Sequence, residues 1–283
     1  MTILVTGARG RIARSLVQQL LSNGAKVRAA GREPAAAQLP EGVEAVAADL
    51  ADPDTFGPAL DGVAGVFLYA EPRGLDGFVA AARSAGVRHI VLLSAIGAST
   101  DSADPIARMH GEAERAVAAS GIARTLLRPG GFATNTLSWA PTIRADGTVH
   151  DPFPESHSTP IHEADIAAVA ARALTEPGHE GAVYELTGPE SVTRREQADL
   201  IGEAIGQPVR FVLQSLDDHR ESLAQWGPPE MAEILIEHAE DSVGRPARAT
   251  DTVRRVTGRD ARPYAEWARD HAPDFTGGSS RPR

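Results

Sequence analysis

The chain has 283 residues, no cysteine and a single lysine, Lys26, among its 28 Lys and Arg residues. The absence of cysteine excludes structural disulfides, thiolate zinc sites, iron–sulfur clusters and thiol nucleophiles. None of the three tyrosines, Tyr69, Tyr184 and Tyr264, is followed by a lysine four positions later, so a catalytic Tyr-x-x-x-Lys pair is also excluded.

The formal net charge is −10, and no basic stretch is longer than a dipeptide. Nucleic-acid binding through a basic face is therefore a poor hypothesis. No apolar run approaches the ~20 residues that span a bilayer, and the N-terminus lacks the basic region and cleavage site of a secretory signal. We therefore expect a cytoplasmic protein that does not bind membranes and is a monomer or a homodimer.

Short β-branched runs alternate with Ala-rich helical stretches over the first 130 residues. In chain order the pattern predicts strands at 3–5, 26–30, 43–47, 63–69, 89–94 and 123–127, and intervening helices at 12–21, from Pro53, at 75–84 and at 105–120. Strands that are apolar on both faces and separated by helices indicate a parallel sheet covered on each side. The predicted fold is a Rossmann-like, doubly wound α/β sheet.

The pattern loosens after residue 130. Residues 131–160 show no clear periodicity, and beyond them we predict helices at 163–175, 193–206, 215–225, 229–240, 250–257 and 263–271, with strands at 183–186 and 209–213. This organisation predicts a nucleotide-binding domain over 1–130, to which 160–190 returns. A smaller, mostly helical substrate lobe is predicted from 131–159 and 191–275, and a disordered Gly/Ser/Arg/Pro tail over 276–283.

The strongest motif is the stretch TGARGRIA at 6–13, which directly follows the first strand and opens the first helix. Gly7 allows a tight turn, Gly10 lets the backbone approach a pyrophosphate, and Ala13 takes the place of a third glycine. The N–H groups of a helix N-terminus also favour phosphate. The motif predicts a dinucleotide site, with Arg9, Gly10, Arg11 and Ile12 at the phosphates.

The end of the second strand indicates which dinucleotide is bound. An acidic residue there would bind the ribose 2′-hydroxyl of NAD, whereas this chain has Gly31-Arg32. Arg32 can form a fork onto a 2′-phosphate, with help from Arg9 or Arg11, so NADP(H) is favoured over NAD(H). Asp49 and Leu50 close the third strand and are placed to contact the adenine amino group. A structural role in the N-cap region ahead of Pro53 is the alternative interpretation, and it is compatible with that contact.

With these motifs in place, the chain resembles the NmrA-like atypical short-chain dehydrogenases/reductases from residue 1 to about 275. The segments that carry the resemblance are TGARGRIA at 6–13, GREP at 31–34, ADLADP at 48–53, VLLSAIGA at 91–98, HGEAERAVAASGIARTLLRPGGFATN at 110–135, PIHEADIAAVAARALTEPGHEGAVYELTGPE at 160–190 and VRRVTGRDARPYAEWARDH at 253–271. The resemblance implies a Rossmann domain with a smaller C-terminal lobe and a substrate cleft between them.

The resemblance also locates the missing catalytic pair. The tyrosine and lysine of the wider superfamily would fall at Ile106 and His110. Ile106 cannot donate a proton, whereas family members similar to the quinone reductases also have histidine at the position of His110. Ser94 follows the fifth strand and retains the family's Ser/Thr. Pro129 and Gly130 stand where the family's chain borders the nicotinamide.

These observations define the candidate site residues. His110 and Ser94 are the catalytic candidates, each weighed against a structural role, as a surface-helix histidine and a loop cap respectively. Cofactor contacts are expected from Gly7, Arg9, Gly10, Arg11, Ile12, Arg32, Asp49, Leu50, Tyr69, Ala70, Ser94, Pro129 and Gly130. Substrate contacts are expected from Phe132, Asn135, Trp139, Phe153 and Trp226. For Trp139, Phe153 and Trp226 the alternative role is in the core of the lobe.

No metal site is expected, because the spacing of His150, His157 and His162 matches no ligand pattern, and a structural role suits His162. The predicted function is an NADP(H)-dependent oxidoreductase that transfers a hydride to a small quinone, enone, ketone or imine without the Tyr/Lys pair. A non-catalytic NADP(H)-binding sensor or regulator is the alternative, and an isomerase, epimerase or lyase on the same fold is a third possibility.

Overall fold

A computed structural model describes residues 1–33, 39–71, 73–225 and 229–277. The chain divides into two compact units. Unit 1 comprises residues 1–130, 163–186 and 252–259, and unit 2 comprises 131–162, 187–251 and 260–283. Each unit is described by itself.

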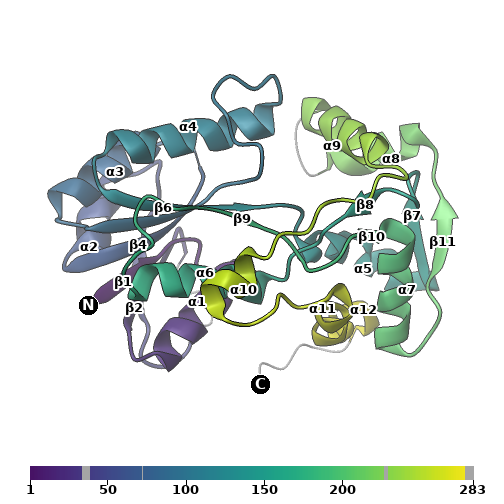
Figure 1. Cartoon of the computed structure of the whole chain (residues 1–283), viewed down its shortest axis with the longest axis horizontal. Helices are drawn as coiled ribbons and strands as arrows, with labels where there is room; N and C mark the ends of the chain where they lie inside the picture. The colour runs from purple at the N-terminus through teal and green to yellow at the C-terminus, as the bar shows by residue number, and fades with distance from the viewer. Residues whose placement is uncertain (34–38, 72, 226–228, 278–283) are drawn as a thin grey trace. The chain divides into compact units, whose positions relative to one another are not determined.

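Unit 1 is built on a seven-stranded sheet in the order β3-β2-β1-β4-β5-β6-β9, in which every neighbouring pair is parallel (Figure 1). This arrangement confirms the predicted doubly wound α/β fold. The strands are β1 (Thr2–Val5), β2 (Lys26–Gly31), β3 (Glu44–Ala47), β4 (Val63–Tyr69), β5 (His89–Leu93), β6 (Ala123–Pro129) and β9 (Val183–Leu186).

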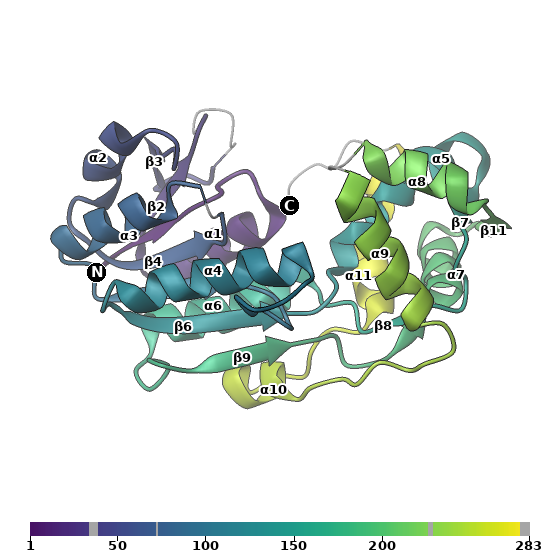
Figure 2. The same cartoon turned by 90° about the horizontal axis from the view of Figure 1, so that it is seen from above.

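Helices cover both faces of this sheet (Figures 1 and 2). Apolar side chains of α2, α3 and α4 form one core cluster with the sheet, while α1 packs against α6 on the opposite face. The helices of unit 1 are α1 (Arg11–Ser22), the 3₁₀ turn η2 (Pro53–Thr55), α2 (Phe56–Leu60), α3 (Leu75–Ser84), α4 (Pro105–Ala119), α6 (Glu163–Thr175) and α10 (Thr252–Thr257).

Backbone hydrogen bonds join the strand ends that carry the predicted cofactor residues. The Ser94 N–H donates to the Leu127 carbonyl at 2.7 Å, and the Gly130 N–H donates to the Leu186 carbonyl at 2.9 Å. Because the strands are parallel, these ends and the glycine turn after β1 share the carboxyl edge of one sheet, where ligands of open α/β sheets bind.

Unit 2 is mostly helical and has its own core, with Trp267 and Tyr264 fully buried. It also contains two small sheets that were not predicted, one pairing β10 with β8 and one pairing β11 with β7. Its elements are η3 (Ala133–Trp139), α5 (Ala140–Asp146), β7 (Thr148–Asp151), β8 (His157–Ser158), β10 (Val192–Thr193), α7 (Arg194–Ile205), β11 (Arg210–Leu213), α8 (Leu216–Ala224), α9 (Pro229–Asp241), α11 (Tyr264–Asp270) and α12 (Ala272–Thr276).

Three details differ from the sequence prediction. Residues 131–160 are not irregular, since they contain η3, α5, β7 and β8. The helix near residue 250 groups with unit 1 as α10, although we placed 191–275 together in the lobe. Residue Thr276 ends α12, so the predicted tail does not begin there, and its remainder from 278 lies outside the described residues.

Candidate functional site

The glycine turn after β1 leaves the N-terminus of α1 open. Gly7 has a φ of +68°, a left-handed conformation that favours glycine, and the Gly10 N–H donates to the Gly7 carbonyl at 2.7 Å to close the turn. Gly10 is the N-cap of α1, yet no side chain caps the helix and no acidic residue occupies its first turn. The turn therefore presents N–H groups and a partial positive charge that suit a diphosphate.

Tyr69, at the end of β4, lies against both glycines of this turn. A Cβ on Gly7 would come within 2.6 Å of Cε2 of the Tyr69 ring, and a Cβ on Gly10 would come within 3.0 Å of its hydroxyl oxygen. Burial raises the pKa of Tyr69 to about 12, an effect that an interaction with the Ala13 N–H partly offsets. The phenol therefore stays protonated at neutral pH beside the first turn of α1.

The residues predicted to select the dinucleotide follow β2. Arg32 is exposed and has no ion-pair partner among the residues that the structure describes. Arg9 is instead paired with Glu33, at 3.1 Å between Nη1 and Oε2, and both side chains are largely exposed. Arg32 is thus the cation that is available at this strand end.

Asp49 and Leu50, the residues predicted to lie near the adenine, both make local contacts within unit 1. Asp49 accepts a hydrogen bond from the Ala51 N–H at 3.0 Å, while Asp52, not Asp49, is the N-cap residue of η2. Asp49 therefore lies just ahead of the cap residue and is not itself the N-cap, and its contact with adenine stays a prediction. The Leu50 carbonyl lies so close to Gly74 that a Cβ there would come within 1.8 Å of it, which requires glycine at position 74.

Ser94 is part of a buried polar network that links β5, α4 and β6. Its hydroxyl donates to Glu114 Oε1 at 2.6 Å, and Arg128 donates to the same carboxylate through Nε at 2.8 Å and Nη2 at 2.6 Å. Ser94 is 2% exposed and the Glu114 side chain 11%. The carboxylate raises the pKa of Arg128, which is the behaviour of an ionised pair.

His110 lies on α4, one helical turn before Glu114. Its Nδ1 is the only buried side-chain nitrogen or oxygen atom found without a hydrogen-bond partner in the described parts of the chain. Burial lowers the pKa of His110, while the charges of Glu114 and Asp104 act in the opposite direction. Helical spacing places His110 and Glu114 on the same face of α4.

The predicted substrate residues belong to unit 2. Phe132 forms an isolated β-bridge with Ile161. Asn135 is exposed. Trp139 is partly buried and packs against the hydrophobic core of unit 2. The half-buried Phe153 makes an edge-to-face contact with His219, with ring centroids 6.4 Å apart. Trp226 lies outside the described residues.

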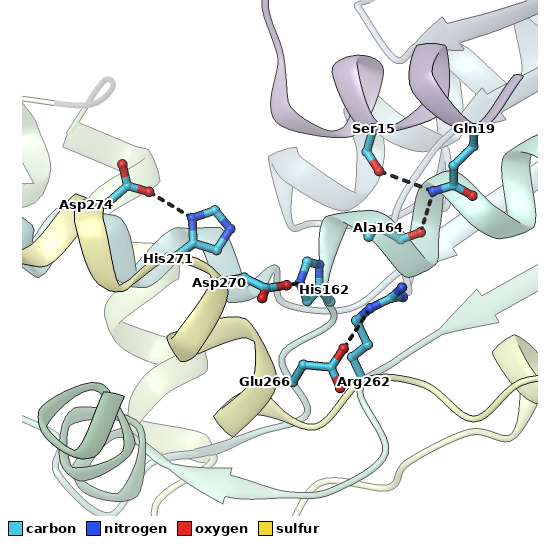
Figure 3. Close-up of polar contacts among 9 residues, drawn as sticks. All are labelled: Ser15, Gln19, His162, Ala164, Arg262, Glu266, Asp270, His271 and Asp274. Carbon is cyan, nitrogen blue, oxygen red and sulfur yellow. Dashed lines mark hydrogen bonds and ion pairs between the residues drawn. The ribbon is translucent and has the colours of Figure 1, made fainter. Parts of the chain in front are cut away.

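Polar contacts around the start of α6 and along α11 are structural (Figure 3). In unit 1, Gln19 Nε2 of α1 donates to the Ala164 carbonyl of α6 at 3.0 Å. In unit 2, His162 is 5% exposed and its Nε2 lies 3.4 Å from Asp270 Oδ2, while His271 pairs with Asp274 at 2.8 Å. His162 thus has an acidic partner from α11.

A polar hollow of about 630 Å³ lies in unit 1 at the C-terminal half of α1. It contains none of the predicted site residues and is lined by Gln18, Gln19, Ser22, Asn23, Ala168, Ala171, Arg172, Thr175, Glu176, Thr257 and Arg259. A diphosphate site is identified by converging N–H groups and charge rather than by depth, so we keep the candidate site at the opposite end of α1.

The described residues meet neither the requirements of a metal site nor those of a membrane-spanning helix. They contain no group of three or more His, Cys, Asp or Glu side chains that could hold a metal ion. Among these residues no helix is long and apolar enough to cross a membrane.

A family model described as NAD(P)H-binding matches residues 7–177, which include the glycine turn, Ser94 and His110. The chain belongs to this NAD(P)H-binding family. The expected membership of the NmrA-like, atypical short-chain dehydrogenases/reductases is confirmed.

Relatives match nearly the whole chain. The (4-alkanoyl-5-oxo-2,5-dihydrofuran-3-yl)methyl phosphate reductase of Streptomyces griseus is 40% identical over 279 residues, covering 96% of this chain and 99% of that protein. The NAD(P)H azoreductase of Xenophilus azovorans is 38% identical over 282 residues, with coverages of 96% and 99%. The crystal structure of an NADPH-dependent quinone oxidoreductase of Escherichia coli has a TM-score of 0.77 and 30% identity, covering 94% of this chain and 98% of that one.

These similarities identify the chain as an NAD(P)H-dependent reductase. They favour the oxidoreductase over the non-catalytic regulator that the missing Tyr/Lys pair also allowed.

Proposed function

We propose that this reductase uses NADPH in preference to NADH and transfers a hydride to a small electron-poor acceptor of the quinone, enone, ketone or imine type. The observation that carries the cofactor preference is Arg32, an exposed cation without an ion-pair partner among the described residues, at the strand end where an NAD site has an acidic group. The NADPH-dependent quinone reductase with the same fold supports this preference.

The residues of the glycine turn fit the proposed cofactor. The uncapped N-terminus of α1 would hold the diphosphate, Arg32 the 2′-phosphate and Asp49 the adenine amino group. Leu50, Ala70, Pro129 and Gly130 would border the cofactor at the strand ends. A bound reduced nicotinamide supplies the hydride, that is, one proton and two electrons, and is left oxidised.

Tyr69 has a specific role in this proposal. Its ring fills the space that the two glycines leave, and the Ala13 N–H interacts with its oxygen. No acceptor for its own O–H proton lies among the residues that the structure describes, so that proton would be donated to a diphosphate oxygen. Tyr69 would in this way extend the first turn of α1 toward the cofactor.

The names of three relatives support the proposed class of acceptor. The name of the Streptomyces griseus enzyme gives a 5-oxo-2,5-dihydrofuran, in which a ring double bond is conjugated to a carbonyl. Other relatives act on azo compounds and quinones. All of these acceptors take a hydride at an electron-poor centre. The reduced oxygens of a quinone are acidic enough to need little help from a general acid, whereas the more basic anions formed from the other acceptors need a proton donor.

Proton delivery is assigned to His110 and to solvent. When a hydride adds to a conjugated carbonyl, the electron pair moves to the oxygen, and a protonated His110 would neutralise that oxygen and become neutral itself. Tyrosine is excluded because none stands at 106. The residues proposed to contact the substrate belong to unit 2 and are Phe132, Asn135, Trp139, Phe153 and Trp226.

The proposal is tested by mixing the protein with NADPH and a panel of quinones, butenolides, azo dyes, ketones and imines, and following the absorbance of the reduced nicotinamide. We expect acceptor-dependent loss of NADPH, one equivalent for each double bond reduced, and slower loss with NADH. Tight NADPH binding without oxidation by any acceptor would contradict the hydride transfer, and equal rates with NADH would contradict the cofactor preference.

A further inference from the structure

The Ser94 hydroxyl has a single proton, and the structure shows where that proton points. Its oxygen lies 2.6 Å from Glu114 Oε1, and the Glu114 carboxylate also accepts two hydrogen bonds from the Arg128 guanidinium, the geometry of an ion pair. An ionised carboxylate only accepts hydrogen bonds, so Ser94 must be the donor. The hydroxyl therefore has only lone pairs left for a ligand.

This arrangement changes the role that the sequence suggested for Ser94. A hydroxyl that presents lone pairs can accept an N–H, such as that of a carboxamide, but it cannot supply a proton to a reduced acceptor. Ser94 is also 2% exposed, which restricts its access to solvent protons. His110 is then the remaining protein group among the catalytic candidates that can deliver a proton.

The charges around His110 come mainly from its own helix. Asp104 is the N-cap of α4, and Glu114 is one turn further along the same face. Among the elements packed against α4, the titratable side chains of α3 are exposed and His89 lies at the far end of β5. On β6, the Arg128 side chain contacts α4 by donating hydrogen bonds to Glu114.

We propose that Glu114 is the positioning residue of this site: it holds Ser94 as a hydrogen-bond acceptor and places a negative charge one helical turn from His110, on the same face of α4. The inference rests on the proposed function, because it concerns the proton that follows hydride transfer. In the step itself, an N–H bond of His110 breaks, an O–H bond forms on the anionic product, and His110 recovers its proton from solvent. Glu114 keeps its charge throughout.

The decisive variant is Glu114→Gln, which removes the charge but keeps the size of the side chain. Without the carboxylate, and with Arg128 still cationic, the pKa of His110 falls. The midpoint at which kcat declines with rising pH should then move down by about half a pH unit or more. The matched control is Glu112→Gln, which makes the same change of charge at an exposed position of α4 that does not face His110.

NMR titration of the His110 ring in the same three proteins gives a readout that needs no substrate. It should show the same downward shift in Glu114→Gln and none in Glu112→Gln. A His110 titration that is identical in wild type and Glu114→Gln overturns the inference, whereas absence of turnover in wild type would contradict only the proposed function.

A second variant keeps the test valid if Glu114→Gln does not fold. Glu114→Asp retains the charge but shortens the side chain by one methylene, so it should keep the His110 midpoint while lowering kcat through displacement of Ser94. Wild-type kcat in a folded Glu114→Asp protein would show that the position of this carboxylate does not matter, and would overturn the inference.

Discussion

Arg32→Glu is the substitution that separates NADPH from NADH most sharply. Arg32 is exposed at the end of β2, has no ion-pair partner among the described residues, and is adjacent to Glu33, which is already paired with Arg9. Reversing its charge would place two neighbouring carboxylates where the 2′-phosphate is proposed to bind, and would remove the guanidinium fork.

The size of the effect follows from the exposure of this strand end. A hydrogen bond to a charged group contributes about 1.5–3 kcal/mol, and solvent around Arg32 favours the lower limit. Because ~1.4 kcal/mol corresponds to tenfold in affinity, the Kd for NADPH should rise about tenfold or more. The Kd for NADH, which lacks the 2′-phosphate, should change by less than about threefold because no charge-assisted contact is lost.

The two dissociation constants are measured by titrating the nicotinamide fluorescence of wild type and variant at fixed ionic strength, since charge effects of this kind are screened by salt. Arg83→Glu makes the same change of charge at an exposed position near the end of α3, and should leave both constants unaltered. Equal losses for NADPH and NADH in Arg32→Glu would refute the assignment of the 2′-phosphate.

Three further predictions concern Tyr69, His110 and Gly111. Tyr69→Phe should weaken NADPH binding about fivefold in a calorimetric titration, because one hydrogen-bond donor to the diphosphate is lost. Tyr184→Phe is the control and should leave the affinity for NADPH unchanged. Tighter binding of NADPH by Tyr69→Phe would mean that the phenol competes with the cofactor. The pKa of His110 is lowered from 6.5 by burial, so its protonated fraction, and with it kcat, should fall as the pH rises through a value below 6.5. His110→Ala should abolish that decline, and an unchanged pH profile would remove His110 from the reaction. In Gly111→Ala the new Cβ would come within 2.3 Å of the Ser99 carbonyl carbon, so the free energy of unfolding in urea should fall by about 1–3 kcal/mol. The control is Gly57→Ala, whose Cβ would have no atom within 4 Å and which should leave that free energy unchanged or raise it slightly.

Much of unit 1 could be predicted because its signals are local. The helix over residues 75–84 and the strand over 63–69 match the structure residue for residue. The helix is followed by a turn at Ala85-Gly86, the strand is preceded by a turn at Asp61-Gly62, and both have clear apolar patterns. The glycine turn could also be predicted, because the spacing of its glycines is typical of one backbone geometry. Family membership and reductase activity followed from these segments.

The parts that were missed depend on distant partners. The two-residue strands β8 and β10 exist only through their pairing with each other, and so have no pattern of their own. A hydrogen-bond network joins three separate elements through Ser94, Glu114 and Arg128. The sequence indicates this network only indirectly, because Arg128 stands near the end of the apolar strand β6 and a charged residue there requires a buried partner. A search for charged residues inside apolar strands would have found Arg128.

The central claim is that this chain transfers a hydride from NADPH to an electron-poor acceptor. Its most direct test uses NADPH that carries deuterium at both C4 positions of the nicotinamide, incubated with the protein and either a quinone or an α,β-unsaturated butenolide. Mass spectrometry and NMR of the butenolide product should show one deuterium on the carbon that accepts the hydride, with NADP⁺ formed in equal amount. Consumption of the butenolide without deuterium in the product, or with the NADPH unchanged, would contradict the claim.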